Sequence, residues 1–143
     1  MTTESRSYVL DSYALLAYLS GEPGFEQVQL VLAQAEHSRY RAFASIINVG
    51  EVLYITEREL GLGRARAVLA MLDDLPIRIV PAGRPEVLAA AHVKANHRIS
   101  YADAFAVVAA QAVGGIVLTG DPEFEGVQDI VTVEWMARKR DGK

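Results

Sequence analysis

The sequence predicts an α/β fold with a mostly parallel sheet of four to five strands. Short β-branched and apolar runs alternate with segments of helical periodicity along all 143 residues, as in a series of β-α-β units. Residues 115–119 (GIVLT) are continuously apolar, which is typical of a strand buried on both faces. No linker or repeat divides the chain, so one domain over residues 1–143 is expected, with its core at about 8–134 and a basic tail at 137–143.

The first half of the chain contains two expected strands and three expected helices. Residues 8–10 (YVL) form a run too short for a helix, and the GEPG stretch breaks the helical pattern that follows it. Residues 25–36 carry an amphipathic helical stripe. Residues 41–44 predict the second strand, and Ser45 is then expected to cap a helix that runs to about Leu60.

The second half alternates in the same way, with proline or glycine at several element ends. Pro76 ends one helix, and the alternating residues 77–80 (IRIV) then predict a strand. The stretch SYADAF (100–105) opens a helix that is almost wholly apolar up to Gly114. The remaining expected elements are helices over 64–75 and 86–97, a strand over 115–119 and a last strand over 130–133.

Composition and charge limit the classes of function. The chain is 51% hydrophobic and 22% charged, as soluble globular proteins are, and its lack of cysteine excludes disulfides and thiolate metal sites. The net charge of −4 argues against binding nucleic acid by bulk charge alone, although a bound cation would still meet phosphate. No apolar run suits a signal peptide or a membrane span, so a cytoplasmic location without membrane contact is expected.

Four acids are expected to meet at one edge of the sheet. Asp11 and Asp121 each end an expected strand, and open parallel sheets bind ligands beyond the carboxyl ends of their strands. Glu51 lies in the second turn of the helix after the second strand, among isoleucines and valines. Asp103 lies in the first turn of a helix too apolar to be exposed on any side. Taken singly, the three aspartates also suit helix caps or a turn.

Together the four carboxylates predict a bound cation. Two carboxylates about 4 Å apart repel each other by roughly 4 kcal/mol at an effective dielectric constant of about 20, so a cluster needs protons or a cation. Sites made only of oxygen ligands favour Mg²⁺ or Mn²⁺, and a water activated by such an ion can attack a phosphodiester in line. The residues therefore predict a Mg²⁺-dependent phosphodiester hydrolase.

Four segments carry a resemblance to a known family: YVLDSYALLAYL, AFASIINVGEVLY, ISYADAFAVVAA and GGIVLTGDPEF, in this order. They resemble the PIN-domain family and, within it, the VapC-type toxins of toxin–antitoxin pairs. The resemblance implies a three-layer α/β/α fold and a Mg²⁺-dependent endoribonuclease, with Mn²⁺ as a substitute ion, that leaves 3′-hydroxyl and 5′-phosphate ends. It also implies a homodimer whose site is covered by the C-terminal segment of a cognate antitoxin.

The resemblance also implies roles for single residues. The family's catalytic and metal-binding acids match Asp11, Glu51, Asp103 and Asp121. Ser12 and Thr119 match hydroxyls that would orient the carboxylates or the metal's waters. Asn48, one helical turn before the family's glutamate, either faces the site or serves the start of its helix.

Other polar residues near these motifs have open roles. Tyr13 departs from the family pattern, in which a small polar residue is common, and Glu123 and Glu125 are further carboxylates near the last acid. Steering of the RNA backbone is expected from Arg64, Arg66, Arg138, Lys139 and Arg140. The other reading of each basic group, including the pair Arg39 and Arg41, is a solvated face.

A second hypothesis belongs to another class of protein. The chain could be a catalytically inactive PIN-like module that only binds protein, with vestigial acids. A complete set of four acids weighs against this hypothesis, because a binding module has no reason to gather four carboxylates.

Overall fold

The computed structural model describes residues 5–137 and is built around a parallel sheet. The strands are β1 (Arg6–Leu10), β2 (Tyr40–Ser45), β3 (Ile77–Val80), β4 (Ile116–Thr119) and β5 (Thr132–Trp135). Their order in the sheet is β3-β2-β1-β4-β5, and each neighbouring pair is parallel. The chain moves outward from β1 to β3 and then crosses to the other side of β1 for β4, so the topological switch lies between β1 and β4.

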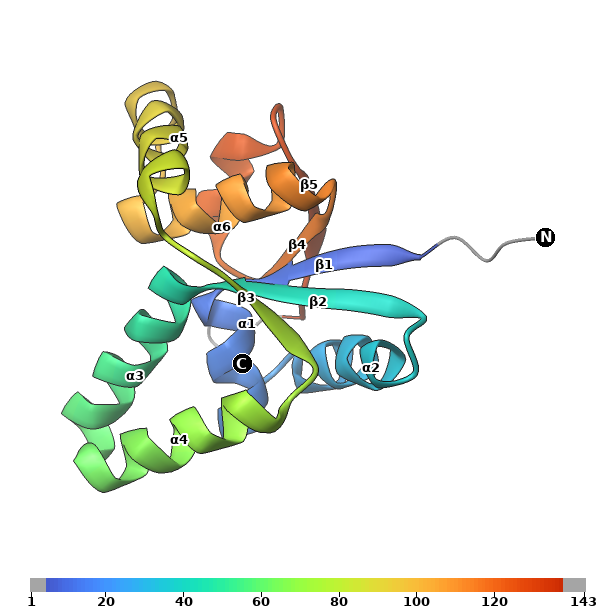
Figure 1. Ribbon diagram of the computed structural model, residues 1–143, viewed down its shortest axis with the longest axis vertical. Coiled ribbons are helices and arrows are strands. Elements are labelled where there is room, and N and C mark those ends of the chain that lie inside the picture. Colours follow the sequence, from blue (N-terminus) through green and yellow to red (C-terminus); the bar gives the residue numbers. More distant parts are fainter. Residues whose placement is uncertain (1–4, 138–143) are drawn as a thin grey trace, which may run out of the picture.

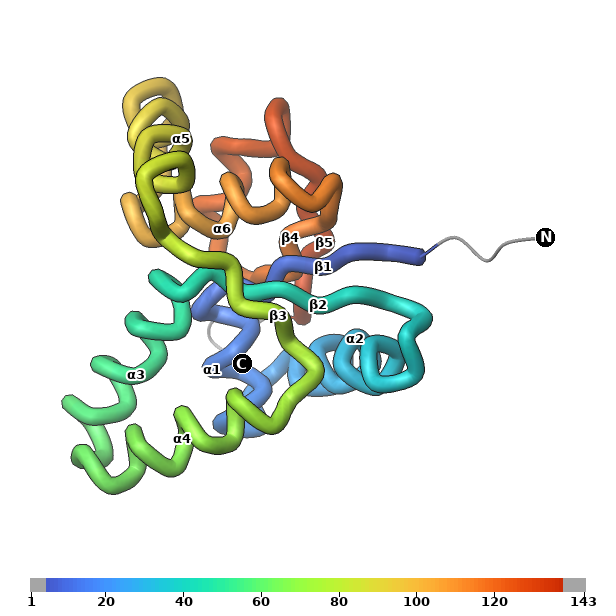
Figure 2. The backbone as a smooth tube through the Cα atoms, viewed as in Figure 1, coloured from blue at the N-terminus to red at the C-terminus, as the bar shows by residue number. Residues whose placement is uncertain are grey.

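Helices cover both faces of this sheet. They are α1 (Ser12–Ser20), α2 (Phe25–Glu36), α3 (Ile46–Leu60), α4 (Leu62–Asp74), α5 (Arg84–Asn96), α6 (Tyr101–Val113) and the short 3₁₀ helix η1 (Pro122–Val127). Figure 1 shows α1 and α2 on one face and α6 on the other, with α5 packed on α6. Helices α3 and α4 form a hairpin that projects beside the sheet, as the backbone trace in Figure 2 also shows.

Each face of the sheet buries its own hydrophobic core. Tyr8 and Leu10 of β1 belong to the core under α1 and α2, whereas Val9 between them belongs to the core under α6. Helix α6 is buried continuously over residues 103–110 because α5 and the sheet cover it from different sides. This burial is the physical reason for the nearly uniform apolar sequence of α6.

The predicted α/β class and the parallel central sheet are confirmed. The helix expected over residues 25–36 and the strand expected over 77–80 have the predicted limits. Ser45 caps α3 as expected, because its Oγ accepts a hydrogen bond of 3.1 Å from the backbone N–H of Ile47. Helices α4 and α5 each begin two residues earlier than the sequence pattern suggests, at Leu62 and Arg84.

The last strand lies two residues later than expected. The limits predicted for this strand, residues 130–133, are wrong, because β5 spans Thr132–Trp135. The backbone N–H groups of Ile130 and Val131 donate to the carbonyl oxygen of Val127, at 3.0 and 3.1 Å, and so belong to the turn after η1. Pairing with β4 therefore begins only at Thr132.

Two expectations concern the chain's surroundings and its basic tail. No helix within residues 5–137 is long and apolar enough to cross a membrane. Arg138, Lys139 and Arg140, which were expected to steer RNA, lie outside the described residues.

Candidate active site

Asp11 lies at the topological switch, directly after β1. It is 0% exposed, and both of its carboxylate oxygens accept hydrogen bonds. Oδ1 accepts from the backbone N–H of Ala14 at 2.9 Å, so Asp11 does cap α1. Oδ2 accepts from the hydroxyl of Thr119 at 2.5 Å. The cap and the inter-strand contact together fix the carboxylate at the carboxyl edge of the sheet.

Thr119 connects two of the predicted acids. It ends β4, and its buried Oγ1 donates to Asp11 and accepts from the backbone N–H of Asp121 at 2.9 Å. The Oδ1 atom of Asp121 in turn accepts from the N–H of Glu123 at 2.9 Å, which caps η1. The expected turn role of Asp121 is therefore present, and the same geometry holds the residue beside Asp11.

Asp103 is placed by the N-terminus of α6. Ser100 is the N-cap, and its Oγ accepts from the backbone N–H of Asp103 at 3.1 Å. The backbone N–H of Ser100 donates to Oε1 of Glu123 at 2.8 Å, which ties the start of α6 to the loop after β4. Asp103 itself is only 5% exposed, although its side chain is a carboxylic acid. The cap therefore belongs to Ser100, and the carboxylate of Asp103 is not needed for it.

Helix α3 contributes two buried oxygens that have no hydrogen-bond partner in the described chain. Asn48 is 0% exposed and donates through Nδ2 to the carbonyl oxygen of Ala102 at 3.2 Å, which joins α3 to the first turn of α6. Its Oδ1 atom and the Oε1 atom of Glu51 are the unpartnered oxygens. A buried acceptor without a partner costs about 1–3 kcal/mol, so this pair indicates that the site is incomplete without a ligand.

The electrostatics show that the four acids share one environment. Burial raises the pKa of Asp11 to about 7, against the hydrogen bonds from Thr119 and Ala14, and the charges of Asp121 and Glu51 raise it further. Burial also raises the pKa of Asp103 to about 8, with added repulsion from the charges of Asp11, Asp121 and Glu51 and an opposing hydrogen bond from Ser100. The charges of the other three acids therefore act on Asp103, and those of Asp121 and Glu51 act on Asp11.

The donor set fits a hydrated divalent cation. Within residues 5–137, no three histidine, aspartate or glutamate side chains converge closely enough to form a ready-made metal cluster. Mg²⁺ does not require one, since it usually binds one or two carboxylates and keeps several waters. The unpartnered Oε1 of Glu51 and the mutual repulsion of the acids are both relieved by a cation with oxygen ligands.

The remaining predicted site residues are less closely connected to the acids. Ser12 begins α1 and is half-buried, and its side chain makes no hydrogen bond to another described residue. Arg64 and Arg66 are exposed on α4, in the projecting hairpin, and form no ion pair in the described part of the chain. Their expected roles stay predictions.

Three further side chains lie on the elements that follow or carry the acids. Glu123 accepts a hydrogen bond from the backbone N–H of Ser100, so its side chain has a structural role. The ring of Tyr13 packs so closely on Gly120 that a Cβ atom at that position would collide with it. Tyr101 is 46% exposed and makes an edge contact with Phe105 at a ring-centroid distance of 5.1 Å. A tyrosine at the first position of an otherwise apolar helix was the available sequence signal for this exposed ring.

Comparison with known proteins gives a family match and a set of similar folds. The PIN domain family model matches residues 8–130, which is most of the chain. A search of curated protein sequences gives no significant match.

Several solved structures resemble the chain over most of its length. The VapBC2 structure from Rickettsia felis, bound to a promoter DNA fragment, has a TM-score of 0.69 at 14% identity and covers 91% of this chain and 98% of that one. The DNA-bound VapBC structure from Salmonella typhimurium has a TM-score of 0.70 at 18% identity, with 90% and 97% covered. VapC20 from Mycobacterium tuberculosis, a toxin that cleaves the sarcin-ricin loop, has a TM-score of 0.67 at 16% identity, with 82% and 92% covered. Identities this low show a shared fold.

Proposed function

The chain belongs to the PIN domain family, and we propose that it is a Mg²⁺-dependent endoribonuclease that acts as the toxin of a type II toxin–antitoxin pair. The observation that carries the proposal is the electrostatic coupling among four acids near the switch between β1 and β4, where burial and mutual repulsion raise the pKa values of Asp11 and Asp103. Similar folds from VapBC structures, and from a toxin that cleaves the sarcin-ricin loop, support this choice of function.

The proposed ligands of the cation come from two strand ends and two helices. Asp11, Glu51 and Asp103 would hold a Mg²⁺ ion, or Mn²⁺ in its place, and Asp121 would complete the site. When bound, the ion supplies the Lewis acidity that favours attack of water on a phosphodiester and stabilises the charge that develops on the phosphate. Without a cation these buried carboxylates favour their protonated forms, as the raised pKa values of Asp11 and Asp103 indicate.

Neutral residues position the acids for this task. Thr119 holds Asp11 from the neighbouring strand, and Ser100 holds the first turn of α6 around Asp103. Asn48 joins α3 to α6 through Ala102, so the helix that carries Glu51 keeps its place. Each contact fixes a carboxylate before substrate binds, which lowers the cost of organising the site for reaction.

The partners of the chain follow from the same proposal. A cognate antitoxin would cover the site, and two copies of the chain would form a homodimer in the cytoplasm. Support comes from the α3–α4 hairpin, which exposes large apolar side chains that a partner would bury; these are Tyr54, Leu60, Leu62, Leu69 and Met71. Arg64 and Arg66 on α4 would guide the RNA backbone towards the acids.

The ends of the cleaved RNA test the proposed reaction. The purified chain is incubated with structured RNA in Mg²⁺, in Mn²⁺ and in EDTA, and the product ends are determined. Attack by water gives 5′-phosphate and 3′-hydroxyl ends in either metal and no products in EDTA. Cyclic phosphate ends, or cleavage that persists in EDTA, would contradict the proposed chemistry. No cleavage in any metal would favour the inactive protein-binding module.

A further inference from the structure

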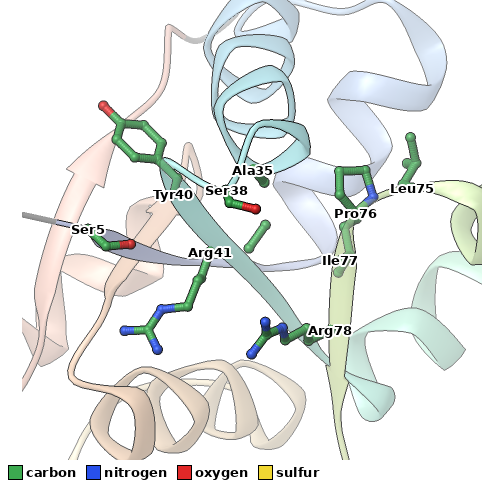
Figure 3. A pocket seen from close by; sticks show the side chains of 10 residues that line it. Ser5, Ala35, Ser38, Tyr40, Arg41, Leu75, Pro76, Ile77 and Arg78 are labelled. Carbon is green, nitrogen blue, oxygen red and sulfur yellow. The ribbon is translucent and has the colours of Figure 1, made fainter. Parts of the chain in front are cut away.

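Two arginines lie at the edge of the sheet opposite the acids. Arg78 of β3 pairs with Phe43 of β2, two residues along the strand from Arg41, so Arg41 and Arg78 lie on the same face of the sheet. Both border a cavity of about 630 Å³ at the amino ends of β2 and β3. Figure 3 shows that the two guanidinium groups extend to the same side of β2. Their juxtaposition requires the fold, since the sequence places Arg41 only in a basic pair with Arg39.

Within residues 5–137, neither arginine forms an ion pair with an acid. The one ion pair found within residues 5–137 joins His97 to Asp129, on other elements. Asp73 and Asp74 end α4 close to the cavity, but neither forms an ion pair with Arg41 or Arg78. Two like charges on neighbouring strands of one sheet face repel each other, so this arrangement is stabilised by an anion that binds both.

Further hydrogen-bond donors lie at the same edge of the sheet as the two arginines. Ser7 of β1 pairs with Arg41 in the register of the sheet and lies on the same face, where it is only 5% exposed. Its Oγ has no hydrogen-bond partner in the described residues. The hydroxyl-bearing residues Ser5, Ser38 and Tyr40 line the cavity itself. Figure 3 shows Ser38 and Tyr40 on the other side of β2 from the two guanidinium groups. Among the described residues, the lining thus offers cations and hydroxyl donors and no carboxylate, which suits a ligand that only accepts hydrogen bonds.

We propose that this cavity binds a phosphate group through Arg41 and Arg78. The planar guanidinium fork matches the oxygens of a phosphate, and two such groups can hold one phosphate from two sides. The site is separate from the acids, because the five residues of β1 span roughly 16 Å between the two edges of the sheet. The proposal goes beyond the nuclease activity and does not depend on it.

Titration with inorganic phosphate tests the site directly. Binding is followed by NMR of the arginine side chains and of the backbone amides of β2 and β3, in EDTA, with sodium chloride of equal ionic strength as the control. Phosphate should shift these signals saturably, and chloride should not. Arg41→Gln and Arg78→Gln should each weaken binding at least about tenfold, whereas Arg84→Gln, at an exposed position that begins α5, should bind as the wild type does.

A stability measurement separates a phosphate site from a structural role of the arginines. In low salt without phosphate, Arg41→Gln and Arg78→Gln should melt at the wild-type temperature or above it, because each removes repulsion. Only the wild type and Arg84→Gln should then gain stability from phosphate. Equal shifts by phosphate and chloride, or undiminished binding by both glutamine variants, would overturn the proposal.

Two further ligands identify the source of the phosphate. Uridine monophosphate and a short oligouridylate are titrated under the same conditions, in which EDTA leaves the acidic site without a cation. If only the mononucleotide displaces inorganic phosphate, the site is assigned to a free phosphate compound. If the oligouridylate displaces inorganic phosphate as well, the site is assigned to the backbone of a polynucleotide. Since no cleavage is measured, a chain without nuclease activity would still give a clear answer about this site.

Discussion

The hydroxyl of Thr119 donates a 2.5 Å hydrogen bond to the carboxylate of Asp11, across 108 residues of sequence. The two residues end the neighbouring strands β4 and β1, on either side of the topological switch. Asp11 is fully buried, so this bond and the cap contact from Ala14 are what keep an acid at that position. The catalytic proposal depends on this fixed carboxylate.

Removal of the Thr119 hydroxyl should destabilise the fold. Thr119→Val keeps the shape of the side chain but leaves the Oδ2 atom of Asp11 and the backbone N–H of Asp121 each without a partner. The free energy of unfolding should fall by about 1–3 kcal/mol in urea at neutral pH without metal. Thr119→Ser, which keeps the hydroxyl, is the matched control. A valine variant as stable as the wild type would show that the bond does not support the site.

The stability of the metal-free chain should decrease with rising pH. The folded chain raises the pKa values of Asp11 and Asp103 from the ordinary 3.8 to about 7 and about 8, so it binds protons more tightly than the unfolded chain does. Their contribution is therefore complete below about pH 4 and is lost as pH rises towards 8, by at most about 1.4 kcal/mol per pH unit for each group.

Urea unfolding in EDTA at several pH values measures this loss. Asp11→Asn cannot titrate, so it should flatten part of the slope. Stability that stays constant or rises between about pH 5 and 8 in the wild type would contradict the burial of two uncompensated acids.

Mn²⁺ should stabilise the chain through Glu51. Its Oε1 atom is buried without a partner, and its charge raises the pKa values of Asp11 and Asp103. The wild type should therefore melt at a higher temperature in Mn²⁺, with a gain of about 2.7 kcal/mol at a hundred times Kd. Glu51→Gln should lose this gain, and Glu57→Gln, an exposed residue of the same helix, should keep it. An undiminished gain in Glu51→Gln would exclude Glu51 as a ligand.

The negative charge of Glu123 should not be needed for RNA cleavage. Its Oε1 accepts from the backbone N–H of Ser100, and a glutamine oxygen makes the same bond. Glu123→Gln should therefore cleave RNA within a few-fold of the wild-type rate, whereas Asp121→Asn should be much slower. A Glu123→Gln variant as inactive as Asp121→Asn would instead make Glu123 a metal ligand.

The fold was largely predictable because local patterns match the burial that the chain achieves. The amphipathic stripe over residues 25–36 and the alternation over 77–80 correspond to elements with the predicted limits. The last strand was misplaced because Ile130 and Val131 are β-branched and look like strand residues. Their backbone groups bond to Val127 instead, and no local propensity reports that contact.

The candidate site was predictable only in part. Asp11 and Asp121 follow apolar runs, and the parallel topology then brings strand ends together. The bond from Ser100 to Glu123 spans 23 residues and has no pattern in the sequence. Arg78 lies near Arg41 only because of the register between β2 and β3. Helices α3 and α4, and not a short turn, connect these two strands, so the sequence does not reveal their register.

The rate of RNA cleavage by Asp103→Asn tests the central claim most directly. The substitution keeps the size of a side chain that is 5% exposed, and the matched control is Asp73→Asn, an exposed acid at the end of α4. In Mg²⁺, Asp103→Asn should cleave structured RNA at least about 10²-fold more slowly than the wild type, and Asp73→Asn should cleave at the wild-type rate. Equal rates for all three proteins would show that the four acids do not form the reaction site.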